Sequence, residues 1–193
     1  MSDTHTSPTN LFPIEADEDL VLENAFWSFA CRLYKQDDVA STCLELQDSF
    51  GINVNALLFM VWLGAQGYPP SEARYLAILD ALSPWTAQVV GNLRLARRAW
   101  KRLGGEVPAL RSGREALKQV ELLSEQIVCA CLFRSSRRWG MPCGAFSAED
   151  RATEAGDLVL RLAGMGADRR GAIARQLAAA ALAVVDKFEG SPK

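Results

Sequence analysis

The chain has 193 residues, of which 49% are hydrophobic and 23% are charged, and its formal net charge is −2 at pH 7. This length suits a single domain that buries its own core, and the composition is typical of an ordinary globular protein. The slightly negative net charge argues against a general nucleic-acid binder, so we do not expect a nucleic-acid partner.

The cysteine and histidine content excludes most metal and redox sites. Five cysteines are present, and no two of them form a Cys-x-x-Cys pair; the single histidine is His5, in the N-terminal tail. Structural zinc sites need paired ligands at short spacing, and most hydrolase triads need a histidine. We therefore expect no metal site, no cofactor and no catalytic residue, and we interpret the cysteines as reduced, mostly core-filling thiols of a cytoplasmic protein.

The two ends of the chain predict neither a targeting signal nor a membrane span. Residues 1–20 are rich in Ser, Thr, Pro and acidic residues and lack an apolar core, which is typical of a disordered tail. The apolar run from Leu177 to Val185 is shorter than the roughly 20 residues that a bilayer requires. We expect a single all-α domain over residues 21–189, with no membrane insertion.

Two helices are predicted before the centre of the fold. Asn24 is suited to cap a first helix that runs to about Lys35, because its side-chain oxygen can accept a hydrogen bond from the first turn. A second helix has apolar residues at spacings of four, three and four: Val39, Cys43, Leu46 and Phe50. Gly51 ends this helix, since glycine readily takes the left-handed conformation found there.

The next segment predicts a buried central helix. Asn53 can cap it, and the residues from Ala56 to Leu63 are apolar in every direction around a helix. No face is left for water, so this helix belongs in the middle of the fold.

The stretch around this central helix carries the pattern Leu-Gln-Asp…Gly…Val-Asn…Leu-Leu-Phe…Trp-Leu, and Asn-Ala-Phe-Trp-Ser-Phe precedes it at residues 24–29. Over residues 24–125 the chain resembles a family of uncharacterised proteobacterial proteins, known only as a domain of unknown function. The resemblance implies no activity, cofactor or site residue. It leads us to expect an aspartate at the position of Asn53. Asparagine in its place is compatible with a capping role but argues against a metal-ligand role.

Two further helices are predicted after a rigid corner at residues 67–70. Ser71 begins the first, which ends at Leu82. Ser83 and Pro84 then predict the start of another helix, because serine at the cap and proline at the first helical position are a favoured pair.

This fifth helix has two well-separated faces. The apolar face consists of Val89, Leu93, Ala96, Trp100 and Leu103. The basic face consists of Arg94, Arg97, Arg98, Lys101 and Arg102.

A long sixth helix is predicted from about Ala109 to Arg137. Its buried stripe consists of Leu117, Val120, Ser124, Ile127, Val128 and Cys131. Glu121 falls within this stripe and Glu125 at its edge, which is unusual for carboxylates unless positive charge faces them.

Two more helices are predicted, from Ser147 to about Gly164 and from Arg169 to Phe188. No stretch has the two-residue alternation of a strand. The sequence therefore predicts an all-α bundle of seven to eight helices around residues 55–65.

The basic face of the fifth helix is the first candidate for function. It could contact an acidic protein surface or a negatively charged head group. The alternative is a solvated face paired with acidic neighbours, and no aromatic residue is interleaved on it to stack on bases.

The carboxylates of Glu121 and Glu125, one helical turn apart, are the second candidate. Such a pair can hold a divalent cation or act as acid and base. Metal-binding bundles, however, use several carboxylate helices and commonly a histidine, which this core lacks. We favour a structural ion pair with Arg94 or Arg97 that fixes how the fifth and sixth helices pack.

The polar residues around Gly51 are the third candidate: Gln47, Asp48, Asn53 and Asn55. Asp48 opposes the dipole at a helix C-terminus, so we expect it to build the turn by accepting backbone hydrogen bonds. The functional alternative is a polar floor to a pocket lined by Trp27, Phe59 and Trp62.

Two hypotheses follow. The first is a non-enzymatic protein-interaction or regulatory module that uses the basic face, with another protein or a second copy as its partner. The alternative is a small-molecule or lipid-binding helical protein, with an enzyme included in this class, whose pocket lies near the central helix. Its expected lining is Trp27, Gln47, Asp48, Asn55, Trp62, Glu121 and Glu125.

Overall fold

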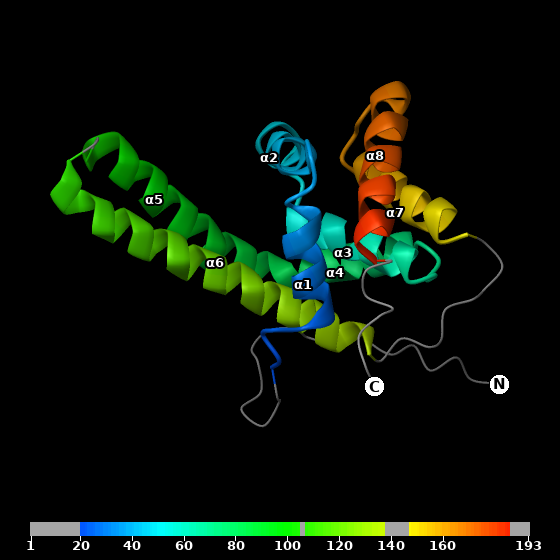
Figure 1. Cartoon of the computed structure of the whole chain (residues 1–193), viewed down its shortest axis with the longest axis horizontal. Coiled ribbons are helices and arrows are strands. Elements are labelled where there is room, and N and C mark those ends of the chain that lie inside the picture. The colour runs from blue at the N-terminus through cyan, green and yellow to red at the C-terminus, as the bar shows by residue number, and fades with distance from the viewer. Residues whose placement is uncertain (1–19, 105–106, 138–146, 186–193) are drawn as a thin grey trace.

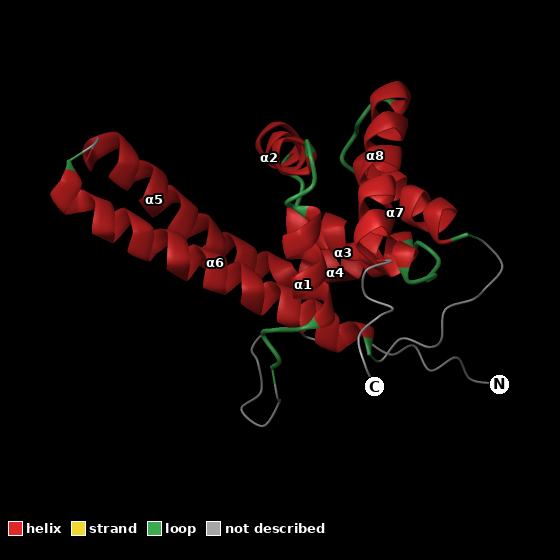
Figure 2. Cartoon of the chain, in the orientation of Figure 1, coloured by secondary structure: helices red, strands yellow, loops and turns green. Residues whose placement is uncertain are grey.

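A computed structural model describes residues 20–104, 107–137 and 147–185. These residues form helices joined by short loops, without a strand, so the predicted all-α fold is confirmed (Figure 2). In chain order the elements are α1 (Ala25–Leu33), α2 (Val39–Phe50), α3 (Val54–Ala65), α4 (Glu72–Trp85), a π-helical stretch η1 (Thr86–Val90), α5 (Gly91–Gly104), α6 (Pro108–Ser136), α7 (Ala148–Leu162) and α8 (Ala167–Val185). The expected N-terminal tail up to residue 19, Cys143 and the end of the last helix lie outside the described residues.

The central helix α3 is buried almost completely, as predicted. Eleven of its 12 residues are buried, and only Asn55, near its N-terminus, is partly exposed. Helices α1, α2, α4, α6, α7 and α8 all contact it, and Figure 1 shows it in the middle of the body. Because this helix is apolar on every side, its neighbours must surround it to keep it from water.

The predicted helix ends of this region are confirmed by their hydrogen bonds. The Trp27 amide donates to Asn24 Oδ1 (2.9 Å), and the Ala56 amide donates to Asn53 Oδ1 (3.1 Å). Gly51 has φ 65°, the left-handed conformation that favours glycine. These local features join α2 to α3 through a short turn at residues 51–53.

The predicted break at Ser83 and Pro84 is wrong. Pro84 lies inside α4, and the helical backbone continues through η1 into α5. Proline removes one backbone hydrogen bond, and the wider π turn that follows it, in which the Gly91 amide donates to the Thr86 carbonyl, lets the helix continue. Contacts from outside the helix hold this segment: Asn53 Nδ2 donates to Thr86 Oγ1 (3.4 Å).

Helices α5 and α6 pack against each other and form an arm that projects from the body (Figure 1). The C-terminal half of α6 rejoins the core, where Val128, Cys129 and Leu132 are buried. The arm is therefore anchored at one end and free at its tip.

Of the apolar residues that the sequence highlights on the two helices of the arm, Trp100 contacts α6, but several others remain exposed. Leu103 and Trp100 of the apolar face of α5 are 81% and 38% exposed, and Val120, which we expected in the buried stripe of α6, is 49% exposed. Arg94 and Arg97 instead point toward α6, where they contact Glu121. The expectation for Val120 is wrong because no described helix covers that side of the arm.

Helices α3 and α7 approach so closely that only glycine fits at position 64. A Cβ atom on Gly64 would lie 2.5 Å from the Arg151 carbonyl oxygen and 2.6 Å from Ala152 Cα, and both are backbone atoms that cannot rotate away. This contact fixes the distance between the core helix and the C-terminal helix pair.

We expect Gly64→Ala to lower the free energy of unfolding by about 1–3 kcal/mol or more, because overpacking forces the two backbones apart. Urea denaturation followed by circular dichroism measures the change. Gly171→Ala on α8 is the matched control: the nearest atom would be the mobile end of Arg175 at 3.4 Å, so this change should be neutral or stabilise by up to about 1 kcal/mol. Equal stability of the Gly64→Ala protein and the parent would contradict the described packing.

Candidate functional site

A cavity of about 510 Å³ lies where the arm joins the body, and its walls come from α1, α2, α3, α5 and α6. This volume is within the roughly 300–1,000 Å³ range of small-molecule sites. Its apolar wall includes Trp27, Leu44, Leu58 and Leu122. Its charged lining consists of Lys35, Arg94, Arg97, Arg98, Glu121 and Glu125.

Most of the residues expected around a pocket do line this cavity. Those that line it are Trp27, Gln47, Asn55, Glu121 and Glu125. Trp62 does not: it is 8% exposed and packs in the core between Phe26 and Phe133, with ring centroids 5.6 and 6.0 Å away.

Asp48 has neither of the roles that we considered for it. Its side chain is 57% exposed, does not line the cavity, and pairs with Arg98 across a distance of 3.2 Å. The turn after α2 is built instead by Gly51, whose amide donates to the Gln47 carbonyl, and by the cap of Asn53. Asp48 therefore forms an exposed link between α2 and α5.

The basic face of α5 and the expected pocket overlap in the structure. Arg94, Arg97 and Arg98 line the cavity, although the sequence suggested two separate sites. Lys101 lies farther along the arm, in an open depression of about 340 Å³ that Arg97 also lines, whereas Arg102 is exposed and lines neither space. The five residues thus divide between the cavity and the outer arm.

The predicted ion pair between α5 and α6 is present as a cluster of four side chains. Arg94 Nε lies 3.1 Å from Glu121 Oε1, and its Nη2 donates to Glu125. Arg97 Nε lies 2.5 Å from the second oxygen of Glu121. Glu121 is only 8% exposed, so both its carboxylate oxygens depend on these arginines for compensation.

The surroundings of the cluster raise the pKa of both Glu125 and Arg97. Burial raises the pKa of Glu125, and the neighbouring Arg94 offsets only part of that effect. The hydrogen bond to Glu121 raises the pKa of Arg97, so its guanidinium stays charged. Burial likewise raises the pKa of the Cys31 thiol, which lines the cavity, so this cysteine is not an activated nucleophile. The arrangement favours binding of a charged group over covalent chemistry.

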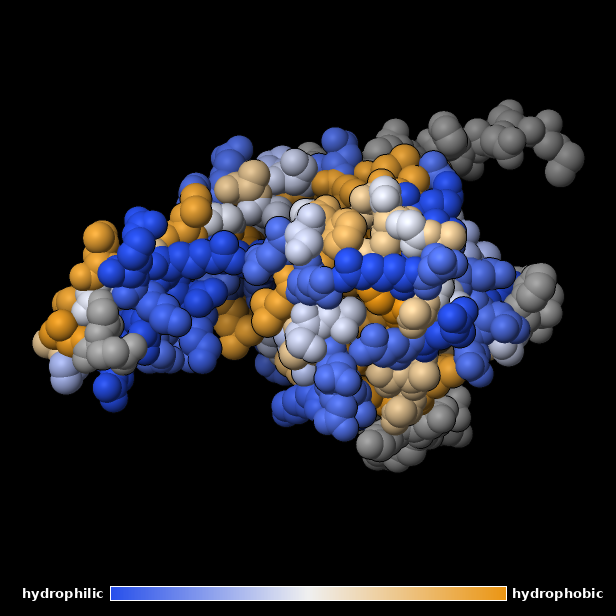
Figure 3. Space-filling model, turned by 90° about the horizontal axis from the view of Figure 1, so that it is seen from above, coloured by the Kyte–Doolittle hydropathy of each residue, from blue (hydrophilic) through white to orange (hydrophobic). Residues whose placement is uncertain are grey.

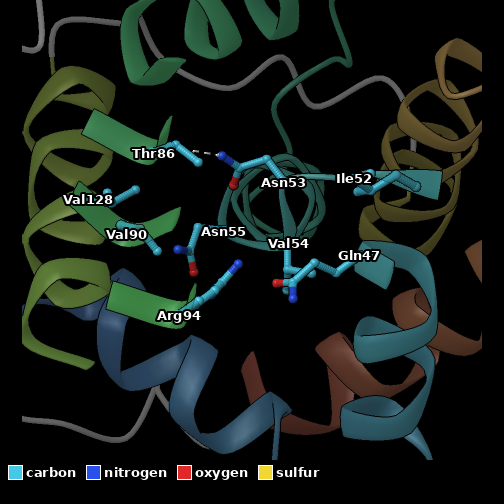
Figure 4. A pocket seen from close by; sticks show the side chains of 10 residues that line it. Gln47, Ile52, Asn53, Val54, Asn55, Thr86, Val90, Arg94 and Val128 are labelled. Carbon is cyan, nitrogen blue, oxygen red and sulfur yellow. Dashed lines mark hydrogen bonds between the residues drawn. The ribbon is translucent and has the colours of Figure 1, made fainter. Parts of the chain in front are cut away.

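A smaller cavity of about 140 Å³ adjoins the first one at the start of α3. Both are lined by Gln47, Val54, Asn55 and Arg94. In Figure 4 the side chains of Asn55 and Arg94 point toward each other inside this space, while Thr86 lies at its far edge. The two cavities therefore adjoin each other, with Gln47, Asn55 and Arg94 as polar residues at their junction.

Sequence reasoning missed the contribution of α1 beyond Trp27. Cys31 and Tyr34 also line the cavity, four and seven residues after Trp27, which is the spacing of one helix face. Thr86 and Val90 of the smaller cavity were missed for another reason, since nothing in the sequence indicated the π-helical stretch that carries them.

Within the ranges that the structure describes, no three His, Cys, Asp or Glu side chains gather in a way that could hold a metal ion. None of the helices described is both long enough and apolar enough to cross a bilayer.

We expect Glu121→Gln to lower the free energy of unfolding by about 1–3 kcal/mol, because it leaves Arg97 without its paired carboxylate and Arg94 with Glu125 alone at a half-buried interface. Arg97→Gln should lower the free energy of unfolding less in the Glu121→Gln background than in the parent protein. The difference, which is the coupling energy of the double-mutant cycle, should be about 1 kcal/mol. Urea denaturation of the four proteins measures this coupling.

The matched control for this cycle is Glu115→Gln. Glu115 is on the same helix but is 51% exposed, and its carboxylate lies 3.9 Å from the exposed Lys118, so the change should stay within about 0.5 kcal/mol. Additive effects of the Glu121 and Arg97 changes would show that the cluster does not hold the arm together.

Comparison with known proteins adds a family but no activity. The family described as "Protein of unknown function (DUF2390)" matches residues 25–132, which run from the start of α1 into the last turns of α6. No curated protein and no solved structure matches the chain. The match covers more than half of the 193 residues and every residue that lines the cavities described above, and the chain therefore belongs to this family of unknown function.

Proposed function

We propose that this protein is a non-enzymatic interaction module that binds another protein through the α5–α6 arm, and that the partner presents an acidic surface with an apolar patch. The single observation that carries the proposal is the open apolar side of the arm. A two-helix arm whose inner seam is ionic and whose leucines face outward is suited to packing against a further element.

The exposed large hydrophobic side chains are concentrated on the arm. Eight of the 12 in the described part of the chain lie there: Leu95, Trp100, Leu103, Val107, Leu110, Val120, Leu122 and Leu123. Figure 3 shows hydrophobic side chains at the tip of the arm and along one edge, beside a strongly hydrophilic row. Scattered exposed leucines need no explanation, but a concentration on one projecting element is typical of a protein interface.

The two helices contribute to the same apolar side. Arg98 of α5 and Leu122 and Glu125 of α6 line the cavity and so mark one side of the arm. A helix turns by about 100° per residue, which places Leu103 of α5 and Val120 of α6 well away from that side. Exposed apolar residues of both helices therefore lie on the side of the arm away from the cavity.

The charge of the arm selects the kind of partner. Between Gly91 and Glu125 the sequence has eight basic and four acidic residues, although the whole chain has a net charge of −2. The open depression on the arm repeats this excess, since Arg97, Lys101, Arg114 and Lys118 line it with a single carboxylate. Positive potential of this kind steers and aligns an acidic protein surface.

A nucleic acid fits the arm less well. Trp100, the aromatic residue of α5, donates its indole N–H to the Leu110 carbonyl (2.9 Å), and its ring covers Gly113. This ring already packs against α6 and is not free to stack on a base. The exposed leucines beside it would gain nothing from phosphate groups.

We expect that a photo-crosslinking residue at position 103 captures a partner in cells of the protein's own host, whereas the same residue at position 76 does not. Leu76 is 49% exposed on α4, away from the arm, and is therefore the matched position. A crosslink to a second copy of the chain would overturn the proposal of an acidic partner and show self-association instead.

The affinity of the captured, purified partner then tests the surface. Leu103→Ser combined with Val120→Ser should weaken binding at least tenfold, about 1.4 kcal/mol, because interface energy is concentrated in buried apolar anchors. Lys101→Glu should also weaken binding, and its effect should be larger at low salt than at high salt. Leu76→Ser should change neither the affinity nor its salt dependence. A partner that binds the Leu103→Ser, Val120→Ser protein as tightly as the parent would overturn the proposal.

The cavity at the root of the arm favours a second candidate function, the binding of a small molecule. Its volume of about 510 Å³ and its mixture of apolar wall and converging charges are the observations that support it.

A further inference from the structure

We infer that the cavity at the root of the arm binds a small amphipathic anion, that is, an oxyanion head group attached to an apolar body. This ligand class develops the second candidate function and is independent of the protein partner proposed for the outer arm.

The shape of the site separates a head from a body. The larger space of about 510 Å³ opens between α1, α2 and the arm, and the smaller one of about 140 Å³ ends at the start of α3. Gln47, Asn55 and Arg94 line both spaces and so stand at the junction between them. A ligand whose body fills the larger space would place its end among these polar side chains at the junction.

The body would lie against the apolar wall of the larger space. Trp27 of α1, Leu44 of α2 and Leu122 of α6 come from three different helices and face the same cavity. Leu44 and Leu122 are 52% and 44% exposed without a ligand, so a hydrocarbon group would remove apolar surface from water at both. Burial of such surface is favourable in proportion to its area.

The head group would accept hydrogen bonds at the polar end. Arg94 uses Nε and Nη2 for the two glutamates, and its Nη1 makes no hydrogen bond within the described chain. Asn55 accepts a weak hydrogen bond from the Cys129 thiol (3.9 Å), which leaves its amide N–H groups for a ligand. Figure 4 shows both side chains pointing into the same hollow, with Gln47 approaching from α2.

The charge of the lining selects an anion. Lys35, Arg94, Arg97 and Arg98 line the cavity with Glu121 and Glu125, and Asp48, outside the lining, pairs with Arg98, so one positive charge remains in excess. Glu121 and Glu125 hold Arg94 in place before any ligand arrives, which reduces the entropy that binding must overcome. The N-terminus of α3 lies at the same end and adds positive potential to that of the side chains.

Simpler ligands satisfy only half of the site. An inorganic anion would leave the apolar wall in contact with water. A neutral hydrocarbon chain would desolvate the guanidinium and amide donors without replacing their hydrogen bonds. Only a molecule with both parts uses the whole cavity.

The test measures binding of four probes to the full-length protein by isothermal titration calorimetry: decanoate, decyl phosphate, 1-decanol and inorganic phosphate. We expect decanoate or decyl phosphate to bind at least tenfold more tightly than the last two, and the better of the two distinguishes a carboxylate from a phosphate head group. The same ligand should slow alkylation of Cys31, which lines the cavity, at least threefold in peptide-resolved mass spectrometry. Equal binding of 1-decanol, equal binding of inorganic phosphate, or no binding of either decyl anion would overturn the inference.

Two matched pairs of variants locate the ligand. Leu122→Gln should weaken binding at least fivefold and Leu123→Gln should not, because these neighbours are 44% and 46% exposed but only Leu122 lines the cavity. Arg98→Gln should weaken binding severalfold, and Arg102→Gln, farther along the same helix, should not. All four positions are exposed, so the variants should fold, which circular dichroism verifies. Unchanged binding in both Leu122→Gln and Arg98→Gln would place the ligand elsewhere and overturn the inference.

Discussion

The burial of α3 is the constraint on which the rest of this fold depends. A helix that is apolar on every side can exist in water only if other helices enclose it, and here α1, α2, α4, α6, α7 and α8 do so. Asn55 is the one residue of α3 that is not buried. The enclosure opens at this point, and the polar end of the cavity begins there. The candidate site thus lies where the central helix carries its only side chain suited to contact with water or a ligand.

The arm follows a different physical rule from the body. Its seam is held by Arg94 and Arg97 against Glu121, while leucines of both helices remain exposed. A half-buried ion pair contributes less net stability than well-packed apolar side chains would. If stability of the isolated chain were the only requirement, the leucines would be expected inside the seam and the charges outside. The reversed arrangement is what connects the packing of the arm to its proposed role in binding.

Local signals in the sequence predicted the fold well, and signals that depend on distant contacts did not. The caps at Asn24 and Asn53 and the apolar run of α3 act within one or two turns, so their residues alone were sufficient. Glu121 in an otherwise apolar stripe correctly pointed to arginines on the neighbouring helix. Pro84 misled because Trp85 donates to the Ser124 carbonyl (3.2 Å) and Thr86 bonds Asn53, and these contacts with α6 and α3 hold the helix together past the proline. The apolar face of α5 misled because periodicity shows that a helix has two faces but not which face meets a neighbour.

The same distinction explains why the cavity and the basic face looked like separate features. Trp27, Asn55, Arg98 and Glu125 lie far apart in sequence, and only the return of α6 alongside α5 brings them together. All of them fall within the family match at residues 25–132, whereas α7 and α8 lie beyond it. Helix α7 nevertheless meets α3 at Gly64 so closely that no other residue fits. The matched segment therefore contains both candidate binding surfaces but leaves one side of α3 uncovered, and the C-terminal helices supply the apolar cover that the central helix requires.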